Sequence, residues 1–244
     1  MNTASTAIVL AGGFGTRLRA VVSDLPKPLA PIRGIPFLKH LLSQIASQGI
    51  RNAVLSVGYL GEKIEKDLGY SFGPLSLSYV HEDRPLGTGG AVRFALATLP
   101  PTPGPVFVMN GDSYFPIPLH DLAQDFLGHQ GALACLALKR MSPADRYGTV
   151  ELGPDGRIYS FREKTALEEG LINGGIYVLS RDFLQVTPAD RPFSLETDVF
   201  APRCPQGSLF GREFDAPFID IGIPEDYRHA QDMIPLLPGE RPTS

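Results

Sequence analysis

The segment LAGGFGTR, residues 10–17, places three glycines and an arginine directly after a short apolar run. Glycines at such a turn let backbone N–H groups approach and hold phosphate oxygens. Arg17 adds a planar guanidinium that binds phosphate through two hydrogen bonds. A dinucleotide-binding fingerprint is excluded because Leu18 stands in place of its third glycine, and a Walker A loop is excluded because no G-K-[ST] follows. The segment predicts a phosphate-binding loop, with a plain tight turn as the alternative for the glycines alone.

Lys27 stands between two prolines in Pro26-Lys27-Pro28. Because proline disfavours a helix and restricts the residue before it, we expect an extended chain that presents the lysine as a fixed point charge. A lysine in such a loop is by itself more often simply exposed. The interpretation as a site residue therefore depends on the phosphate-binding loop that precedes it.

Two aspartates follow or end apolar segments. Asp112 lies in Asn110-Gly111-Asp112, and Asp220 lies in FIDIG, residues 218–222. A carboxylate at the carboxyl end of a strand suits Mg²⁺, which usually binds one or two carboxylates together with substrate phosphates. A lone aspartate in an apolar strand is costly to bury unless it is paired or bound to a metal. We therefore expect both carboxylates to hold Mg²⁺, with a simple turn as the alternative for Asn110-Gly111-Asp112.

The loop EDRPLGTGG, residues 82–90, lies between an expected strand and an expected helix. Its glycines let a planar base approach the backbone, and the Glu82 carboxylate can accept hydrogen bonds from base N–H groups. A flexible connection is the alternative. Three further segments carry polar groups suited to a sugar and its phosphate: Tyr147-Gly148, Arg162-Glu163-Lys164 and Asn173-Gly174. Each of them alone is more typical of an ordinary protein surface.

The composition excludes several other classes of protein. The net charge of −4 lacks the basic footprint of a nucleic-acid-binding protein. The two cysteines, Cys135 and Cys204, are too few for a disulfide framework or a Cys-rich zinc site and fit a reducing compartment. The histidines share no metal-ligand spacing, and neither a G-x-S-x-G elbow nor a Cys/His pair indicates a covalent nucleophile. Because no apolar run could span a membrane and no signal peptide is visible, we expect a cytoplasmic enzyme, monomeric or homodimeric, without nucleic-acid or membrane partners.

Alternating apolar segments predict an α/β fold. The alternation favours a parallel sheet with helices on both faces, and ligands bind such sheets beyond the carboxyl ends of the strands. We expect strands at 7–11, 53–57, 75–80, 106–109 and 132–138, and helices at 37–48, 61–68, 89–99 and 119–127.

After residue 140 the pattern becomes rich in strands. The segments 149–152 and 157–161 flank the sequence GPDG, which is typical of a hairpin turn. Two further strands are expected at 172–179 and 208–214, and a last helix at 224–236. We expect one domain over residues 1–237, in which a β-rich lobe lies over the first half's sheet and shares its core, and a frayed tail at 238–244.

In order along the chain, LAGGFGTRL, PKP, GTGG, NGD, EK, NGG and D-x-G resemble the motifs of the sugar-1-phosphate nucleotidylyltransferases, also called nucleotide-sugar pyrophosphorylases. The first two motifs are the most specific, and the resemblance extends from residue 8 to about residue 228. It implies a Rossmann-like nucleotidyltransferase fold of the glycosyltransferase-A type, with a mixed, mainly parallel sheet flanked by helices. It also implies a nucleotide-binding part at about 1–140 and a small β-rich sugar-phosphate-binding part at about 141–223.

The resemblance implies a role for each matching position. Arg17, Lys27 and Asp112 would be catalytic, with Arg17 on the leaving pyrophosphate and Lys27 at the α-phosphate. Asp112 and Asp220 would hold Mg²⁺. The nucleotide would be bound by Leu10, Ala11, Gly12, Gly13, Gly15, Thr16, Arg17, Lys27, Glu82, Pro85, Gly87, Thr88, Asn110 and Gly111. The sugar phosphate would be bound by Tyr147, Gly148, Glu163, Lys164, Asn173 and Gly174.

Within the family, LRAVVSDLPKPLAPI, RPLGTGGA, INGGIY and FIDIGIPEDY are most similar to the guanylyltransferases that act on D-glycero-α-D-manno-heptose 1-phosphate. The expected partners are therefore GTP and that sugar phosphate, with pyrophosphate and GDP-heptose as products. Transfer of a guanylyl group to mannose 1-phosphate, or of a uridylyl group to muramate 1-phosphate, remains open. A nucleotide-sensing subunit without activity is disfavoured because Arg17, Lys27 and both aspartates are present.

Overall fold

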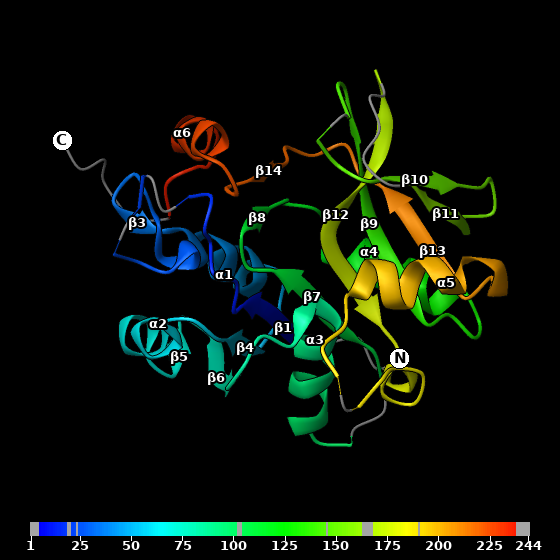
Figure 1. Ribbon diagram of the computed structural model, residues 1–244, viewed down its shortest axis with the longest axis horizontal. Helices are drawn as coiled ribbons and strands as arrows, with labels where there is room; N and C mark the ends of the chain where they lie inside the picture. The colour runs from blue at the N-terminus through cyan, green and yellow to red at the C-terminus, as the bar shows by residue number, and fades with distance from the viewer. Residues whose placement is uncertain are drawn as a thin grey trace.

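The structure is a computed structural model that describes residues 5–18, 21–22, 24–101, 104–144, 146–162, 168–189 and 191–237. A ten-stranded sheet forms its centre, and its main path runs β11-β10-β12-β7-β1-β4-β6-β5, with β9 paired to β12 and β13 to β9 (Figure 1). Its strands are β1 (Thr6–Ala11), β4 (Asn52–Val57), β5 (Ser71–Phe72), β6 (Leu75–His81), β7 (Val106–Asn110), β9 (Ala134–Met141), β10 (Thr149–Leu152), β11 (Ile158–Arg162), β12 (Gly170–Leu179) and β13 (Leu209–Glu213).

Two short strand pairs lie outside this sheet, and helices connect the strands. The pairs are β2 (Pro31–Ile32) with β3 (Ile35–Pro36), and β8 (Ser113–Tyr114) with β14 (Ile219–Asp220). The helices are α1 (Phe37–Ser47), α2 (Gly61–Leu68), α3 (Gly87–Thr98), α4 (Leu119–Gly128), α5 (Ala201–Arg203) and α6 (Pro224–Met233), with 3₁₀ turns η1 (Lys27–Leu29), η2 (Arg181–Leu184) and η4 (Cys204–Gln206) and a π-helix η3 (Leu195–Phe200). None of the helices in the described ranges is long and apolar enough to cross a membrane.

The first half of the chain forms the parallel part of the sheet, as its alternating pattern predicts. Strands β7, β1, β4 and β6 are parallel neighbours in that order. Their carboxyl ends therefore meet at one edge, where the loops after Ala11, His81 and Asn110 begin. This edge is where the sequence places the candidate phosphate, base and metal residues.

The second half extends this sheet sideways, whereas we expected a lobe over it. Strand β12 pairs antiparallel with β7 and thereby joins β9, β10 and β11 to the same sheet. The expected hairpin is confirmed: β10 and β11 are antiparallel, and the Gly153 amide donates to the Arg157 carbonyl oxygen at 2.8 Å. Because apolar residues of both halves share core clusters, the expectation of a common core holds.

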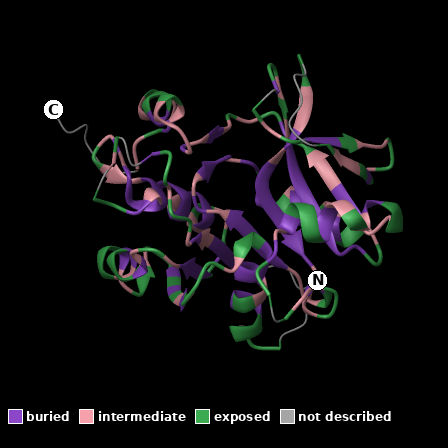
Figure 2. Cartoon of the chain, in the orientation of Figure 1, coloured by how far each residue is buried: buried purple, intermediate pink, exposed green. Residues whose placement is uncertain are grey.

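Strand β1 divides the core into two layers because its side chains alternate between the faces of the sheet. Ala7 and Val9 pack in the layer that contains α1, α2 and α4, whereas Ile8 packs in the layer that contains α3 and η3. Figure 2 shows buried residues concentrated in the central strands. The sheet edge that carries the candidate residues is thus fixed by packing on both faces.

Several local expectations differ from the structure, and the strand expected at 132–138 is one of them, because β9 spans Ala134–Met141. Helix α3 begins at Gly87, two residues before the expected start, and α6 ends at Met233, three residues before the expected end. Lys27 does not lie in extended chain but begins the 3₁₀ turn η1, although Pro26 before it is extended at φ −65° and ψ 144°. Proline is tolerated in the first turn of a helix because its missing N–H would have no partner there.

His40 on α1 is a buried histidine, with 2% of its surface exposed. Within the described part of the chain neither ring nitrogen has a hydrogen-bond partner of normal geometry, although backbone groups of Ile32 and Pro235 lie nearby. Burial disfavours the imidazolium and lowers the pKa of His40 below its ordinary value. The unfolded chain therefore binds a proton at a higher pH than the folded chain does.

We predict that the folded state loses stability as the pH falls from 7 to 5, and that His40→Leu reduces this loss. With a depressed folded pKa, the unfolded state binds more protons in this window, so the free energy of unfolding decreases by up to about 1.4 kcal/mol per pH unit for one such group. Urea titrations at several pH values measure the slope. His120→Leu, at an exposed position of α4, is the control. Equal slopes for wild type and His40→Leu would contradict the prediction.

Candidate active site

Lys27, Asp112 and Asp220 meet at the edge of the sheet. The pairing of β8 with β14 sets Asp220 opposite Ser113, and the Ile221 amide donates to the Asp112 carbonyl oxygen at 3.0 Å. The Lys27 ammonium lies 2.6 Å from Asp112 Oδ2 and 3.2 Å from Asp220 Oδ1. Segments almost two hundred residues apart thus converge on one charged cluster.

The electrostatics of this cluster leave room for a further positive charge. Burial alone would lower the pKa of Lys27, but the charges of Asp112 and Asp220 outweigh it and raise that pKa. Burial, and then the charge of Asp112, raise the pKa of Asp220, while Lys27 opposes the shift. Two carboxylates share one ammonium, so an added cation would relieve their repulsion.

A cleft of about 280 Å³ opens beside this cluster. It contains side chains from the ends of β1, β6 and β7 and from the start of α3, which the chain separates by about a hundred residues. Nine of the predicted nucleotide-site and metal-site residues line it, namely Leu10, Gly12, Gly13, Glu82, Pro85, Gly87, Thr88, Asn110 and Asp112. Phe14 and Ala91 also line it and were missed, because the glycines and the polar residues around them carried the motif.

Gly12 and Gly87 are required by close approaches at this cleft. A Cβ on Gly12 would lie 2.7 Å from Glu82 Oε1, so a larger residue would displace the carboxylate. Gly87 has φ +74°, and its Cβ would lie 2.5 Å from the Phe193 carbonyl oxygen. Both glycines therefore preserve the wall of the cleft.

Glu82 faces the cleft and also holds the loop that follows it. Its Oε1 accepts from the Ser56 hydroxyl at 3.1 Å, and its Oε2 accepts from the Leu86 amide at 3.1 Å. Burial raises the pKa of Glu82 above its ordinary value, and these two hydrogen bonds oppose the shift. Each oxygen retains a second lone pair for a donor inside the cleft.

The glycine loop is held against Lys27 and anchored by Leu18. Gly15 has φ +59°, and a Cβ there would lie 3.0 Å from Lys27 Cβ. Leu18 is 1% exposed and packs with Ile219 and Ile221, so the residue that excludes a dinucleotide fingerprint is the anchor of the loop. Arg17, at the end of the loop, is exposed and has no hydrogen bond or ion pair to any residue that the structure describes.

The remaining loop residues differ in their exposure. Thr16 is exposed, whereas Ala11 is 2% exposed and lies behind the cleft. The Gly111 amide donates to the Leu10 carbonyl oxygen at 2.8 Å, so this glycine supports the cleft from behind. The described cleft lining includes neither Ala11 nor Gly111.

Part of the predicted sugar-phosphate set lies beside Asp220. The Tyr147 ring centroid is 5.9 Å from that of Phe218, and burial together with the charge of Asp220 raises the pKa of Tyr147 to about 12. Gly148 follows in the same loop, where a Cβ would lie 3.1 Å from the Arg162 carbonyl oxygen. Glu163 and Lys164 lie outside the described residues.

Asn173 is fixed by a network that includes an unexpected residue, Glu196. The Asn173 amide donates to the Tyr177 hydroxyl at 2.8 Å and to Glu196 Oε1 at 2.7 Å, and its Oδ1 accepts from the Gly175 amide at 3.0 Å. Glu196 lies in the first turn of η3, where the Ser194 hydroxyl caps the helix. That serine, followed by acidic residues, is a helix-start signal that could have drawn attention to this segment.

Gly174 packs closely and bears no polar side chain. A Cβ on it would lie 2.6 Å from the Phe115 ring. Its neighbour Gly175 lies against Asn110 in the same way. The Asn-Gly-Gly segment therefore packs against Asn110 in the lining of the cleft and against Phe115.

The parallel sheet edge combines a glycine loop, a lysine bridging two aspartates and an adjacent cleft, and such a set of groups suits phosphate-bearing substrates. Residues 6–235 match the model of the nucleotidyl transferase family, and the chain belongs to that family. It is therefore a nucleotidyltransferase.

Three comparisons place the chain within the family. It is 42% identical to a D-glycero-alpha-D-manno-heptose 1-phosphate guanylyltransferase of Aneurinibacillus thermoaerophilus, over 92% of this chain and 96% of that protein. It is 36% identical to a mannose-1-phosphate guanylyltransferase of Mycobacterium tuberculosis, over 96% of this chain and 68% of that protein. The crystal structure of HddC from Yersinia pseudotuberculosis complexed with GMP-PN superposes with a TM-score of 0.80 at 32% identity, covering 93% of this chain and 98% of that one. The predicted fold is thereby confirmed.

Proposed function

We propose that this nucleotidyltransferase transfers a guanylyl group from GTP to D-glycero-α-D-manno-heptose 1-phosphate. An oxygen of the sugar phosphate attacks the α-phosphorus, the bond from that phosphorus to the bridging oxygen of the β-phosphate breaks, and pyrophosphate leaves. The observation that carries the proposal is that Glu82 and Asp112 line the same cleft. That cleft therefore suits a base and a polyphosphate at once. The heptose guanylyltransferase relative supports the choice of both substrates.

The carboxylates of Asp112 and Asp220 suit a divalent cation in addition to the Lys27 ammonium that bridges them. In the described ranges no cluster of three or more His, Cys, Asp or Glu side chains is placed to hold a metal, so Asp112 and Asp220 would hold it together with substrate phosphates. Bound there, Mg²⁺ would neutralise charge on the phosphates. Lys27, already between the carboxylates, would present its ammonium to the α-phosphate.

Arg17 is proposed to hold the leaving pyrophosphate, because an exposed guanidinium with no hydrogen bond or ion pair to a described residue can bind two phosphate oxygens. We predict that Arg17→Ala lowers kcat by about 10- to 100-fold, since a hydrogen bond to a charged group contributes about 1.5–3 kcal/mol. Pyrophosphate release in steady state measures this. Arg51→Ala, an exposed arginine at the opposite end of β4, is the control. Wild-type kcat in Arg17→Ala would exclude the role.

The base proposal depends on Glu82. Guanine presents two adjacent donors, N1–H and N2–H₂, and a carboxylate can accept from both. The half-buried Glu82 carboxylate has acceptor capacity left inside the cleft, and adenine would leave it unpaired. Uracil offers one such donor, which makes UTP the expected second choice.

A grid of four NTPs against several sugar 1-phosphates tests both substrate choices, with pyrophosphate release as the readout. GTP with the heptose 1-phosphate should give the highest kcat/KM. Mannose 1-phosphate with GTP is the second candidate, favoured by the similarity to the mycobacterial enzyme, and muramate 1-phosphate with UTP is the third. A preference for UTP or dTTP would reject guanine and leave nucleotidyl transfer intact.

We predict that Glu82→Gln lowers the preference for GTP over ATP by roughly tenfold or more, because an amide replaces one of two acceptor oxygens with a donor. The ratio of kcat/KM for the two nucleotides is the measurement. Glu62→Gln, exposed in the first turn of α2, should leave the ratio unchanged. A ratio equal to that of wild type would mean that backbone groups near Gly87 select the base.

For the sugar, Asn173 and Glu196 are proposed to bind hydroxyl groups of a manno-configured ring beside Tyr147. Their mutual hydrogen bond fixes both side chains before the substrate arrives. The roles of Gly148, Glu163, Lys164 and Gly174 at the sugar phosphate stay predictions, as do the monomeric or dimeric state and a cytoplasmic location.

A further inference from the structure

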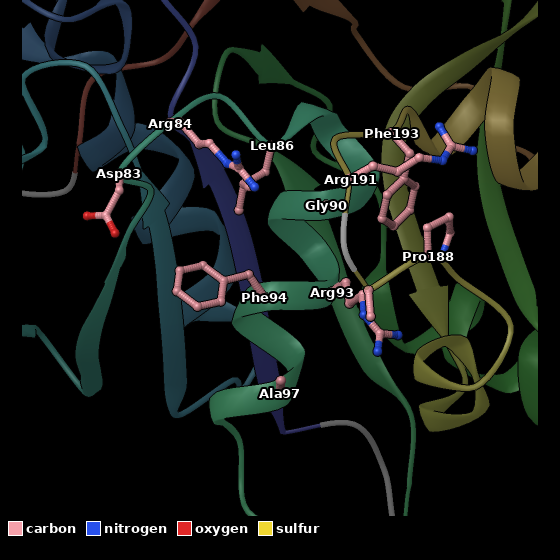
Figure 3. Close-up of a pocket in the computed structure, with 11 residues that line it drawn as sticks. Asp83, Arg84, Leu86, Gly90, Arg93, Phe94, Ala97, Pro188, Arg191 and Phe193 are labelled. Carbon is pink, nitrogen blue, oxygen red and sulfur yellow. The ribbon is translucent and has the colours of Figure 1, made fainter.

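A second and larger cavity, of about 480 Å³, lies beside α3. It is bordered by the loop before α3, by one side of the helix and by residues 188–189, 191 and 193 (Figure 3). Its lining residues are Asp83, Arg84, Leu86, Gly90, Arg93, Phe94, Ala97, Pro188, Ala189, Arg191 and Phe193. This volume is within the range of sites that bind small molecules.

The α3 cavity is distinct from the active-site cleft, because the two share no lining residue. Successive residues of one loop alternate between them: Pro85 and Gly87 line the cleft, whereas Arg84 and Leu86 line the α3 cavity. The loop is therefore a thin wall with one cavity on each side.

Arginines outnumber acidic residues in the described lining of the α3 cavity, although the whole chain carries −4. Among the residues that the structure describes there, three are arginines and one is an aspartate. Among the described residues, Arg84 has no hydrogen bond or ion pair, and Arg93 Nη1 donates to oxygens of Leu184 and Thr187. Arg191 Nη1 is 3.8 Å from Asp198 Oδ1, at the limit of an ion pair. The acidic side chains in the described ranges thus neutralise these guanidinium groups poorly.

The α3 cavity also presents apolar surface. Phe94 is 42% exposed, and Leu86, Ala97 and Pro188 line the same space. Figure 3 shows Phe94 extending from α3, and Arg84 extending from the loop above it. A small inorganic anion would leave the apolar surface in water, and an apolar ligand would leave the guanidinium groups without partners.

We propose that the α3 cavity binds a nucleoside diphosphate, free or linked to a sugar, as a second nucleotide site. The arginines would bind phosphate oxygens, and the base would pack on Phe94. The site is also connected to the active-site wall: the Phe193 amide donates to the Leu86 carbonyl oxygen at 2.9 Å, and the Gly89 amide donates to the Phe193 carbonyl oxygen at 3.0 Å. An occupant would therefore contact Phe193 and Leu86, which hold the loop of residues 82–90 in place.

The chain contains no tryptophan, so Phe94→Trp places a single fluorescent reporter in the α3 cavity. This protein is titrated with GDP, GDP-mannose, pyrophosphate and guanosine. We expect saturable quenching of the tryptophan fluorescence by GDP or GDP-mannose. Pyrophosphate and guanosine should bind at least about tenfold more weakly, because pyrophosphate lacks the base and guanosine lacks the phosphates. The lower of the two dissociation constants, for GDP or for GDP-mannose, identifies whether the site prefers the free or the sugar-linked nucleotide.

Adding Arg191→Ala to the reporter protein should raise the dissociation constant about tenfold, because a charge-assisted phosphate contact is lost. The matched control is Arg228→Ala, an exposed arginine on α6. Absence of quenching would overturn the proposal, and so would equal affinity for pyrophosphate or guanosine. Quenching by GDP that Arg191→Ala leaves unchanged would place the nucleotide elsewhere, the active site included, and would also overturn it.

Discussion

Asp112→Asn and Asp220→Asn should each lower kcat by about a thousandfold, because each removes half of the charge that would hold Mg²⁺ at the substrate phosphates. The substitution preserves the shape of the side chain, so the β8–β14 pairing and the fold should survive. Half-saturation should also require roughly tenfold more Mg²⁺, since one carboxylate ligand is lost. Pyrophosphate release measured against Mg²⁺ concentration gives both quantities.

Asp215→Asn is the matched control for these variants. Asp215 also pairs with a lysine, Lys139 at 3.2 Å, but its side chain is fully exposed and it lies outside the cleft lining. Its kcat and its Mg²⁺ dependence should equal those of wild type. EDTA should abolish wild-type turnover, and turnover that persists in EDTA would reject the metal assignment.

The sequence predicts the elements of this site better than their contacts. The apolar runs that become β1, β4, β6 and β7 alternate with helices, and such alternation brings strand ends to one edge of a sheet. This pattern therefore predicts that the glycine loop, Glu82 and Asp112 lie in one region of the protein. Local patterns carry this information because a strand and the loop after it are adjacent in the chain.

The pairing of β8 with β14 could not be predicted in the same way. Each is two residues long, and no period-2 pattern specifies that Asp220 lies opposite Ser113. The resemblance grouped both aspartates as metal ligands, but it gave no indication that Lys27 lies between them. That contact depends on the whole fold, since η1, β8 and β14 come from three distant parts of the chain.

The position of Glu196 in the site also could not be predicted from the sequence. It contacts Asn173 across 23 positions of sequence, and its segment forms a π-helix, which has no strong sequence pattern of its own. The second half of the chain was expected to lie over the sheet, but it extends the sheet sideways. Hairpin signals identify β10 and β11, but they do not tell whether β12 joins an existing sheet or lies over it. The edge of β7 is available, and pairing with β12 satisfies its backbone hydrogen bonds.

Lys27→Ala should lower kcat by about 100- to 1000-fold and change the KM for the nucleotide much less, because a preorganised charge acts on the charge that develops during transfer. Lys27 is 12% exposed in its side chain, so its position is set by the protein before substrate binds. Lys27→Arg should recover only part of the loss, because a planar guanidinium does not fit the place of a compact ammonium. Lys39→Ala is the matched control, since Lys39 pairs with Asp67 at the same 3.2 Å that separates Lys27 from Asp220.

Removing Lys27 also leaves Asp112 and Asp220 without their shared cation, so Mg²⁺ should raise the melting temperature of Lys27→Ala more than that of wild type. A kcat near that of wild type would exclude Lys27 from the reaction, and an equal effect of Mg²⁺ on both melting temperatures would exclude the shared cation site.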